Sequence, residues 1–213
     1  MTDGAAHSMV RYDLIFVTVT NEPAAREHHA CFQAQQMQEL SNIQERRGEG
    51  RSQLLWVLVE DSTRMSENVR LRRAMARSGA KIVRRIATSD RTHGRSQKRA
   101  LALNTIRELG AAGPVWQLDL DVFWSPEVLL EIASRVRPRV TVLLPVAHTP
   151  CGVDYARFSS DGRVLPTNQW VGGRPERALP VHLAGFAFHS SDLRRNDMWR
   201  GGESEFLRQL ISE

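Results

Sequence analysis

The sequence predicts an α/β protein with a mostly parallel sheet that is flanked by helices on both faces. Short apolar runs rich in β-branched residues, such as those at 12–20 and 54–59, are typical of buried strands. Longer polar stretches of helical character separate the apolar runs up to about residue 147, and this alternation indicates parallel strands joined by crossover helices. Acidic residues follow two of the runs, at strand ends where open α/β sheets bind ligands.

The first half of the chain is expected to alternate regularly between strand and helix. Gly79 follows the second helical stretch, as glycine commonly does at a helix C-terminus. A polar loop with several arginines and His93 precedes the third helix. The expected strands of this half are 12–20, 54–59 and 81–86, and the expected helices are 24–46, 66–78 and 97–109.

The second half begins regularly and then changes its pattern. Ser125 suits the cap of a helix, and Pro126 and Glu127 suit its first turn. No linker or repeat interrupts the chain, so we expect one domain over 1–213 with two halves, at about 12–124 and about 125–213. The further expected elements are a strand from Val115, a helix at 126–136, a strand at 140–147, a hairpin around 159–162, a strand at 181–188 and a helix at 202–211.

The composition is that of an ordinary globular protein, with 41% hydrophobic and 25% charged residues in 213. The formal charge of +5 is carried mainly by arginine, which suits phosphate and carboxylate partners. The basic residues are scattered without interleaved aromatics, which argues against nucleic acid. Cys31 and Cys151 form neither a disulfide framework nor a zinc motif. No apolar run approaches the roughly 18 residues of a membrane-spanning helix.

The strand from Val115 ends in Asp119 and Asp121, which are one residue apart. Alternate residues of a strand point to the same face, so the two carboxylates are expected together. Two such acids repel each other unless a cation lies between them, and their hard oxygen ligands suit Mg²⁺ or Mn²⁺. This D-x-D pattern predicts a metal and nucleotide-sugar site. The alternative is that both acids are surface residues or caps at a strand end.

Seven strings across the chain together resemble the β-1,3-glucuronosyltransferases of glycosyltransferase family 43, in order and in spacing. They cover about 14–211, nearly the whole chain. The strings are WVLVEDS at 56–62, QKRALALNTIRE at 97–108, VWQLDLDVFWSPEVLLEI at 115–132, VTVLLPVA at 140–147, DGRV at 161–164, LAGFAF at 183–188 and ESEFLRQLI at 203–211.

The resemblance implies a GT-A type nucleotide-diphospho-sugar transferase fold and inverting transfer from a UDP-sugar, usually UDP-glucuronic acid, with Mn²⁺ or Mg²⁺. It implies a nucleotide-sugar half at about 12–124 and an acceptor half at about 125–213. A glycan or glycoconjugate acceptor, a homodimer and, in a eukaryote, the Golgi lumen are further expectations from the resemblance.

On the donor side, Asp121 matches the family's Mn²⁺ ligand and Asp119 its supporting acid. Leu120 replaces the middle acid of the family's D-D-D string, which contacts the nucleotide ribose. Asp61 matches the acid that holds the uracil, and Arg99 an arginine that faces the nucleotide, with Arg95 near a second one. On the residues alone, Asp61 could equally cap a turn, and the arginines could be a solvated helix end.

On the acceptor side, Glu203 matches the family's catalytic base. Arg177 matches an arginine that contacts the acceptor or the donor carboxylate, and Trp170 approximates a tryptophan that stacks on the acceptor. Without the resemblance, Glu203 reads equally well as a first-turn acid that complements the helix dipole. Without the resemblance, a tryptophan such as Trp170 is more often a packing residue of the core or of a loop than a platform for a sugar.

Three other functions stay open at this point. A transferase could use UDP-xylose or another UDP-sugar, because donor choice depends on pocket contacts. A degenerate nucleotide-sugar-binding protein is suggested by Leu120 and by the lack of a counterpart to the family's C-terminal W-H-T-R string. A basic nucleic-acid-binding domain would show salt-sensitive binding without a metal requirement.

Overall fold

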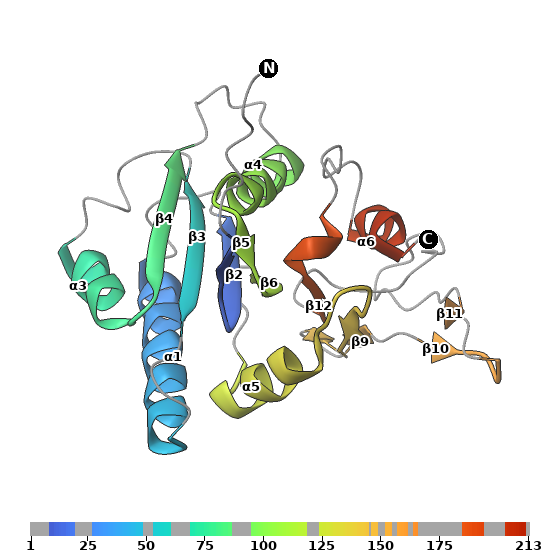
Figure 1. The fold of residues 1–213 in the computed structure, drawn as a ribbon, viewed down its shortest axis with the longest axis horizontal. Coiled ribbons are helices and arrows are strands. Elements are labelled where there is room, and N and C mark those ends of the chain that lie inside the picture. Colours follow the sequence, from blue (N-terminus) through green and yellow to red (C-terminus); the bar gives the residue numbers. More distant parts are fainter. Residues whose placement is uncertain are drawn as a thin grey trace.

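A computed structural model gives the fold of the chain (Figure 1). The structure describes residues 9–19, 27–48, 53–60, 69–86, 95–118, 124–144, 146–148, 152–154, 157–161, 164–165, 185–193 and 203–211.

A six-stranded sheet with the order β4-β3-β2-β6-β12-β7 forms the centre of the molecule. Strands β2, β3, β4 and β6 run parallel, whereas β12 is antiparallel to both of its neighbours, β6 and β7. This confirms the predicted α/β class and its mostly parallel sheet. The strands are β2 (Leu14–Val19), β3 (Leu54–Glu60), β4 (Lys81–Ile86), β6 (Pro114–Leu118), β7 (Val142–Leu143) and β12 (Phe186–His189).

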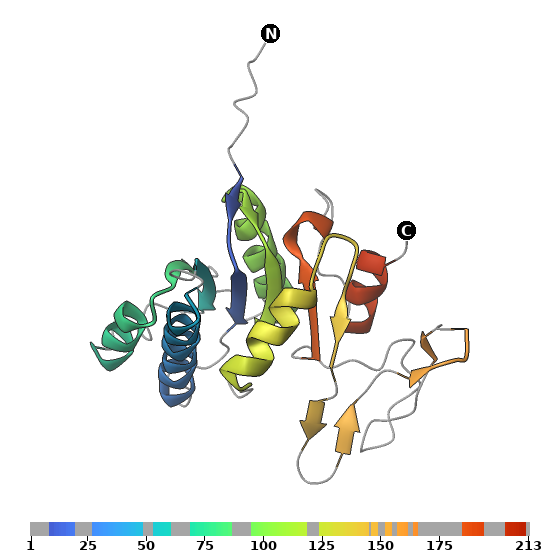
Figure 2. The same ribbon diagram turned by 60° about the horizontal axis from the view of Figure 1, so that its bottom comes forward.

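Helices cover both faces of this sheet, as expected (Figures 1 and 2). One face carries α1 (Glu27–Arg46), α3 (Val69–Arg77) and α5 (Pro126–Arg135), and the other carries α4 (Arg95–Glu108) and α6 (Glu203–Ile211). Among the described residues, no helix combines the length and the apolar character that crossing a bilayer requires.

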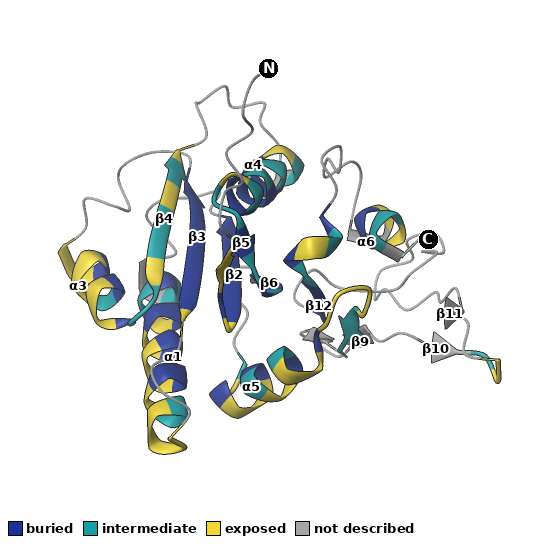
Figure 3. Cartoon of the chain, in the orientation of Figure 1, coloured by how far each residue is buried: buried dark blue, intermediate teal, exposed yellow. Residues whose placement is uncertain are grey.

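The central strands are mostly apolar because both of their faces are buried (Figure 3). In β3, Leu55, Val57 and Val59 pack in the core beneath α4 and α6. The alternate residues, including Trp56, pack in the core beneath α1, α3 and α5. Burial on both sides is typical of parallel sheets and accounts for runs without a polar alternation.

The prediction of one continuous strand over 140–147 was wrong. Only β7 joins the main sheet, and β8 (Val146–His148) pairs instead with β9 (Gly152–Asp154) in a separate two-stranded sheet. Two residues lie between them in sequence, and the second is Pro145, a residue type without an N–H for a ladder hydrogen bond. The expected hairpin is confirmed by the antiparallel pair β10 (Arg157–Phe158) and β11 (Val164–Leu165).

The amino edge of the sheet has a short strand pair that was not expected. β1 (Val10–Arg11) and β5 (Ala111–Ala112) run parallel just before β2 and β6. Gly113 joins β5 to β6, and a Cβ atom there would lie 2.2 Å from the Tyr12 carbonyl oxygen. Its N–H donates to the hydroxyl of Ser190 at 2.9 Å, so this close approach requires glycine.

The helix predicted over 97–109 begins two residues earlier, at Arg95, whereas the predicted signals at two other helix ends are confirmed. The Ser125 hydroxyl accepts a 3.4 Å hydrogen bond from the Val128 N–H, and Pro126 is the first residue of α5. Gly79 follows α3 with a φ of +73°, which suits glycine. The N-terminal turns of the predicted helices at 24–46 and 66–78 lie outside the described residues.

Candidate functional site

The order of the strands creates a switch point between β2 and β6. From β2 the chain proceeds to β3 and β4 on one side, whereas from β6 it proceeds to β7 and β12 on the other side. Parallel strands end at the same edge, so Val19 and Leu118 are neighbouring exits from the sheet. Open α/β sheets bind ligands in the crevice outside such a pair of carboxyl ends.

Residues 119–123 follow β6 in the sequence, and the structure describes the residues immediately before and after them. Before it, β6 is hydrogen-bonded between β2 and β12. After it, the Gln36 side chain donates to the backbone carbonyl of Trp124, and the Trp124 ring lies against Trp116 with centroids 5.7 Å apart. Trp116 of β6 belongs to the core and Trp124 packs against it, so the residues before and after the D-x-D pattern are held by core packing.

Thr18, near the end of β2, carries a buried hydroxyl group at this edge of the sheet. The Thr18 hydroxyl of β2 accepts from the Trp56 indole N–H at 3.1 Å and lies 3.1 Å from the Gln33 side-chain oxygen, to which it donates. These bonds tie α1 to two strands directly below the point where the strands end. Satisfied polar groups of this kind fix one arrangement of a core.

Two cations continue the buried stripe of α4. Ala102, Leu103 and Ile106 pack on the sheet, and one turn earlier the stripe is occupied by Lys98 and Arg99, which are only 4% and 5% exposed. Buried cations are retained in proteins where anionic or polar partners compensate them. α4 follows β4, so its first turns lie at the carboxyl edge, where they suit an anionic ligand.

Gln117 is a buried polar residue of β6, only 1% exposed, two positions before Asp119. Neither its side-chain oxygen nor its side-chain nitrogen has a hydrogen-bond partner among the described parts of the chain. Val115, with the same strand parity, packs in the core beneath α4. An unsatisfied buried amide costs stability, so its retention next to a strand end indicates a functional role.

Glu60 is the last residue of β3 and is 1% exposed. Its Oε2 accepts from the Arg84 Nε at 3.2 Å, and its Oε1 has no partner in the described residues. Burial raises the pKa of the Glu60 carboxyl, and the nearby Arg84 charge opposes this shift only in part. Glu60 therefore makes the protein sensitive to pH at the strand end that leads into Asp61.

Glu60→Gln should flatten the pH dependence of stability. The pKa of Glu60 is raised in the folded state, so ionisation costs stability, and stability falls as pH rises from the ordinary value of 4.5 through the raised pKa. Glutamine removes that fall. Urea unfolding at several pH values measures the slope, with Glu108→Gln, at the neighbouring exposed Arg85 pair, as charge-matched reference. A slope that is the same in Glu60→Gln and in the wild type would contradict the raised pKa of Glu60.

Helix α6 is held against β12 by aromatic packing. The Phe206 ring lies 6.3 Å from Phe186 and 5.7 Å from Phe188 between centroids. Glu203 begins this helix and precedes Phe206 by three residues, so both positions share a helix face. In Figure 2 the C-terminus lies at the end of α6 away from the arrowhead of β2, so α6 begins on the side where β2 ends.

Most of the predicted site residues lie outside the described residues. Asp119 and Asp121 follow β6, and Asp61 follows β3; these three residues, together with Arg177 and Trp170, are not described. Arg95 and Glu203 are the first residues of α4 and α6, whose backbones are described without these side chains. Arg99 is buried, which excludes the alternative of a solvated helix end.

Sequence reasoning missed three described residues at the same edge, namely Lys98, Glu60 and Gln117. Lys98 could have been found from its phase, because it lies four residues before Ala102 on the buried stripe. Glu60 and Gln117 lie near the ends of otherwise apolar strands, and no change in the sequence pattern marks them as buried. Among the described residues, no group of three or more histidine, cysteine or acidic side chains is arranged to hold a metal.

Comparisons with known proteins found a matching family model and similar solved structures. A sequence model of glycosyltransferase family 43 matches residues 50–212. Among solved structures, the chain is similar to 4-diphosphocytidyl-2C-methyl-D-erythritol synthase from Anaerococcus prevotii, with 12% identity and a TM-score of 0.40 over 84% of this chain and 70% of that chain. No curated protein matches the sequence.

Proposed function

The chain belongs to glycosyltransferase family 43, and we propose that it transfers glucuronic acid from UDP-glucuronic acid to a glycan hydroxyl, with inversion and with Mn²⁺. Membership of the family makes the chain a glycosyltransferase with a sugar donor and a glycan acceptor. The donor sugar, the metal and the residue roles below are part of the proposal.

The observation that carries the proposal is the pair of buried cations at the start of α4. Lys98 and Arg99 are buried one turn before the apolar residues of α4, next to the switch point between β2 and β6. A nucleoside diphosphate brings negative charge to this edge, and charge-assisted hydrogen bonds to it are stronger than neutral ones. Arg95, one turn earlier on the same helix face as Arg99, adds a third cation to this set.

The residues at the switch point also fit a hard divalent cation. Two carboxylates, Asp119 and Asp121, provide oxygen ligands of the kind that Mn²⁺ and Mg²⁺ prefer. The side-chain amide of Gln117, two residues before Asp119, adds a buried polar group that has no hydrogen-bond partner among the described residues. We propose Asp121 as the metal ligand and Asp119 as its supporting acid. When bound, the cation supplies neutralisation of negative charge on the diphosphate.

The chain's own residues divide the chemistry between them. Glu203 accepts the proton of the acceptor hydroxyl as that oxygen forms its bond to the anomeric carbon. The bond from that carbon to the diphosphate oxygen breaks, and Arg99, Lys98 and Arg95 stabilise the charge on the departing UDP. Attack opposite the leaving group inverts the configuration of the sugar.

Three further residues complete the binding assignments. Asp61 contacts the uracil ring at the end of β3. Arg177 binds either the acceptor or the carboxylate of the donor, and Trp170 stacks on an acceptor sugar, because sugar faces pack well on aromatic rings. UDP-xylose is the alternative donor, and it would leave Arg177 without a donor carboxylate to bind.

Calorimetry of UDP binding, with and without Mn²⁺, tests the proposal first. We expect binding that strengthens with the metal and that survives about 0.5 M salt, which is well above physiological ionic strength. Transfer assays with UDP-glucuronic acid and UDP-xylose then identify the donor. Metal-dependent UDP binding without turnover would favour a nucleotide-sugar-binding protein, and the lack of any UDP binding by a folded protein would refute the proposal.

A further inference from the structure

A pocket lies at the amino edge of the sheet, opposite the edge with the candidate active site. The cavity has a volume of about 450 Å³, which falls in the range of small-molecule sites. The start of β6 at Pro114 lines this pocket, and β6 ends at Leu118 at the other edge. At about 3.3 Å per residue the two sites are separated by roughly 13 Å along the strand.

Three arginines from three separate elements line the pocket. Arg11 comes from β1, Arg47 follows α1, and Arg137 follows α5. None of the three forms an ion pair within the described parts of the chain. Asp13 is the acid in the lining, and its Oδ2 already accepts from the Gln53 N–H at 2.8 Å. The pocket therefore has an excess of positive charge.

The lining of the pocket also has an apolar part, which suits a small organic body. Leu130, Ala133 and Val136 of the α5 region provide apolar surface. The Gln44 side chain also lines the pocket, and its Oε1 is a buried acceptor with no partner among the described residues. A hydroxyl group on a ligand can satisfy that oxygen, so the lining matches a polar body as well as an anion.

The backbone that carries Arg137 is held in a strained conformation. The Val140 N–H donates to the Arg137 carbonyl at 2.9 Å, and Arg139 has a φ of 66° at the turn position where glycine is favoured. The Asp192 carboxylate accepts from the Arg139 N–H at 2.9 and 3.1 Å. Strain of this kind at a pocket is a common property of binding sites.

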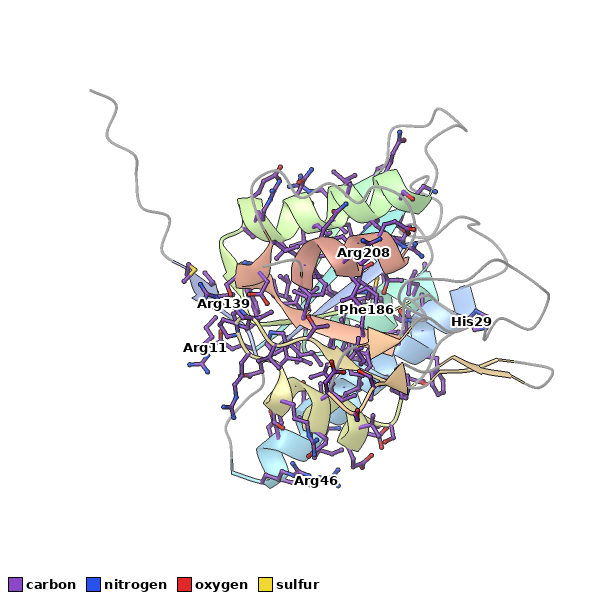
Figure 4. The ribbon with its side chains drawn as sticks, turned by 90° about the vertical axis from the view of Figure 1, so that its right-hand side faces the viewer. Arg11, His29, Arg46, Arg139, Phe186 and Arg208 are labelled. Atoms are coloured by element: carbon purple, nitrogen blue, oxygen red, sulfur yellow. The ribbon has the colours of Figure 1, made fainter. Side chains whose placement is uncertain are left out.

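His189 closes the pocket on the β12 side. Its Nδ1 accepts from the Ser191 N–H at 3.2 Å, so in this tautomer Nε2 carries the proton and is a donor. Figure 4 shows Arg11 and Arg139 together at this end of the molecule, on the side away from His29, which lies near the start of α1. Arg11 of the pocket therefore lies on the side of the molecule away from His29.

We propose that this pocket binds a small molecule that carries a phosphate or sulfate ester, with Arg11, Arg47 and Arg137 on the oxyanion and the Gln44 oxygen on a hydroxyl group. Arginine forks match tetrahedral oxyanions. The volume exceeds the needs of an inorganic ion, and the apolar wall accommodates the remainder of the ligand. The site is separate from the donor crevice and does not depend on the proposed function.

Binding of glucose 6-phosphate and glucose 6-sulfate, with inorganic phosphate and glucose as references, tests this proposal by calorimetry and by NMR of the His189 ring. We expect at least one ester to bind saturably, more tightly than inorganic phosphate, and to shift the His189 signals, whereas glucose does not. UDP with Mn²⁺ should not displace the ester. A His189→Gln variant assigns the ring signals among the histidines of the chain.

A charge-matched pair of double variants identifies the site. Arg47→Gln with Arg137→Gln removes two lining arginines, and we expect ester binding to weaken at least about tenfold. Arg46→Gln with Arg135→Gln removes two neighbours whose side chains bond to Asn42 and Glu131 on the outer helix surfaces, and binding should persist. Equal weakening in both variants, displacement by UDP, or no saturable ester binding would overturn the proposal.

Discussion

Asp121→Ala is expected to abolish metal-dependent donor binding. Asp121 is the proposed ligand of Mn²⁺, and loss of a direct metal ligand should weaken UDP binding in the presence of Mn²⁺ by at least about 100-fold. The rate of transfer should fall on the order of 10²–10³-fold or more, because charge on the leaving diphosphate is no longer neutralised. Calorimetry and a transfer assay measure the two effects independently.

The structure provides the conditions that make this experiment clear. The segment 119–123 lies between β6 and the anchored residue Trp124, so a substitution at position 121 should leave the core intact, as a thermal melt would verify. Asp161→Ala, in the hairpin turn, removes an exposed carboxylate as a matched control. Metal-dependent UDP binding that persists in Asp121→Ala would return the D-x-D pattern to a strand-end coincidence.

The sheet could be predicted because its strands are buried on both faces. Runs such as Leu54–Glu60 have few polar residues, so their type and limits follow from hydrophobicity alone. The direction of β12 could not be predicted in this way. An apolar run such as FAFH pairs equally well in either direction, and its antiparallel pairing with β6 is set by the path of the preceding chain.

The residues of the candidate site that form a local sequence motif could be predicted. The residues that only their burial distinguishes were missed. Asp119 and Asp121 stand out by spacing after an apolar strand. Lys98 and Gln117 did not stand out, because a charged or amide side chain is by default expected at the surface. Only the three-dimensional structure, in which α4 packs on the sheet and β6 lies inside it, reveals that Lys98 and Gln117 are buried.

The pocket at the amino edge has no sequence signature at all. Arg11, Arg47 and Arg137 are far apart in the chain, and each reads singly as a solvated charge. Their convergence depends on where α1 and α5 end relative to β1, which is a property of helix lengths and packing. Sites built from the ends of separate elements are therefore visible only in three dimensions.

Glu203→Gln is expected to remove turnover while it preserves donor binding. Glutamine keeps the shape of the side chain but cannot accept the proton of the acceptor hydroxyl, so kcat should fall by about 10²–10⁴-fold. The affinity for UDP with Mn²⁺ should stay within about twofold of the wild type, since the base contacts the acceptor rather than the nucleotide. The split between the two readouts separates a catalytic role from a structural one.

Glu205→Gln supplies the matched control on the same helix. It removes the same charge two residues further along α6, at an exposed position, and should retain near wild-type transfer. If Glu203→Gln transferred sugar normally, position 203 would be a first-turn acid that complements the dipole of α6. If both variants lost activity together with stability, the packing of Phe206 on Phe186 and Phe188 would be the property that position 203 supports. Melting temperatures of the two variants distinguish these outcomes, because a base contributes to kcat and not to the fold.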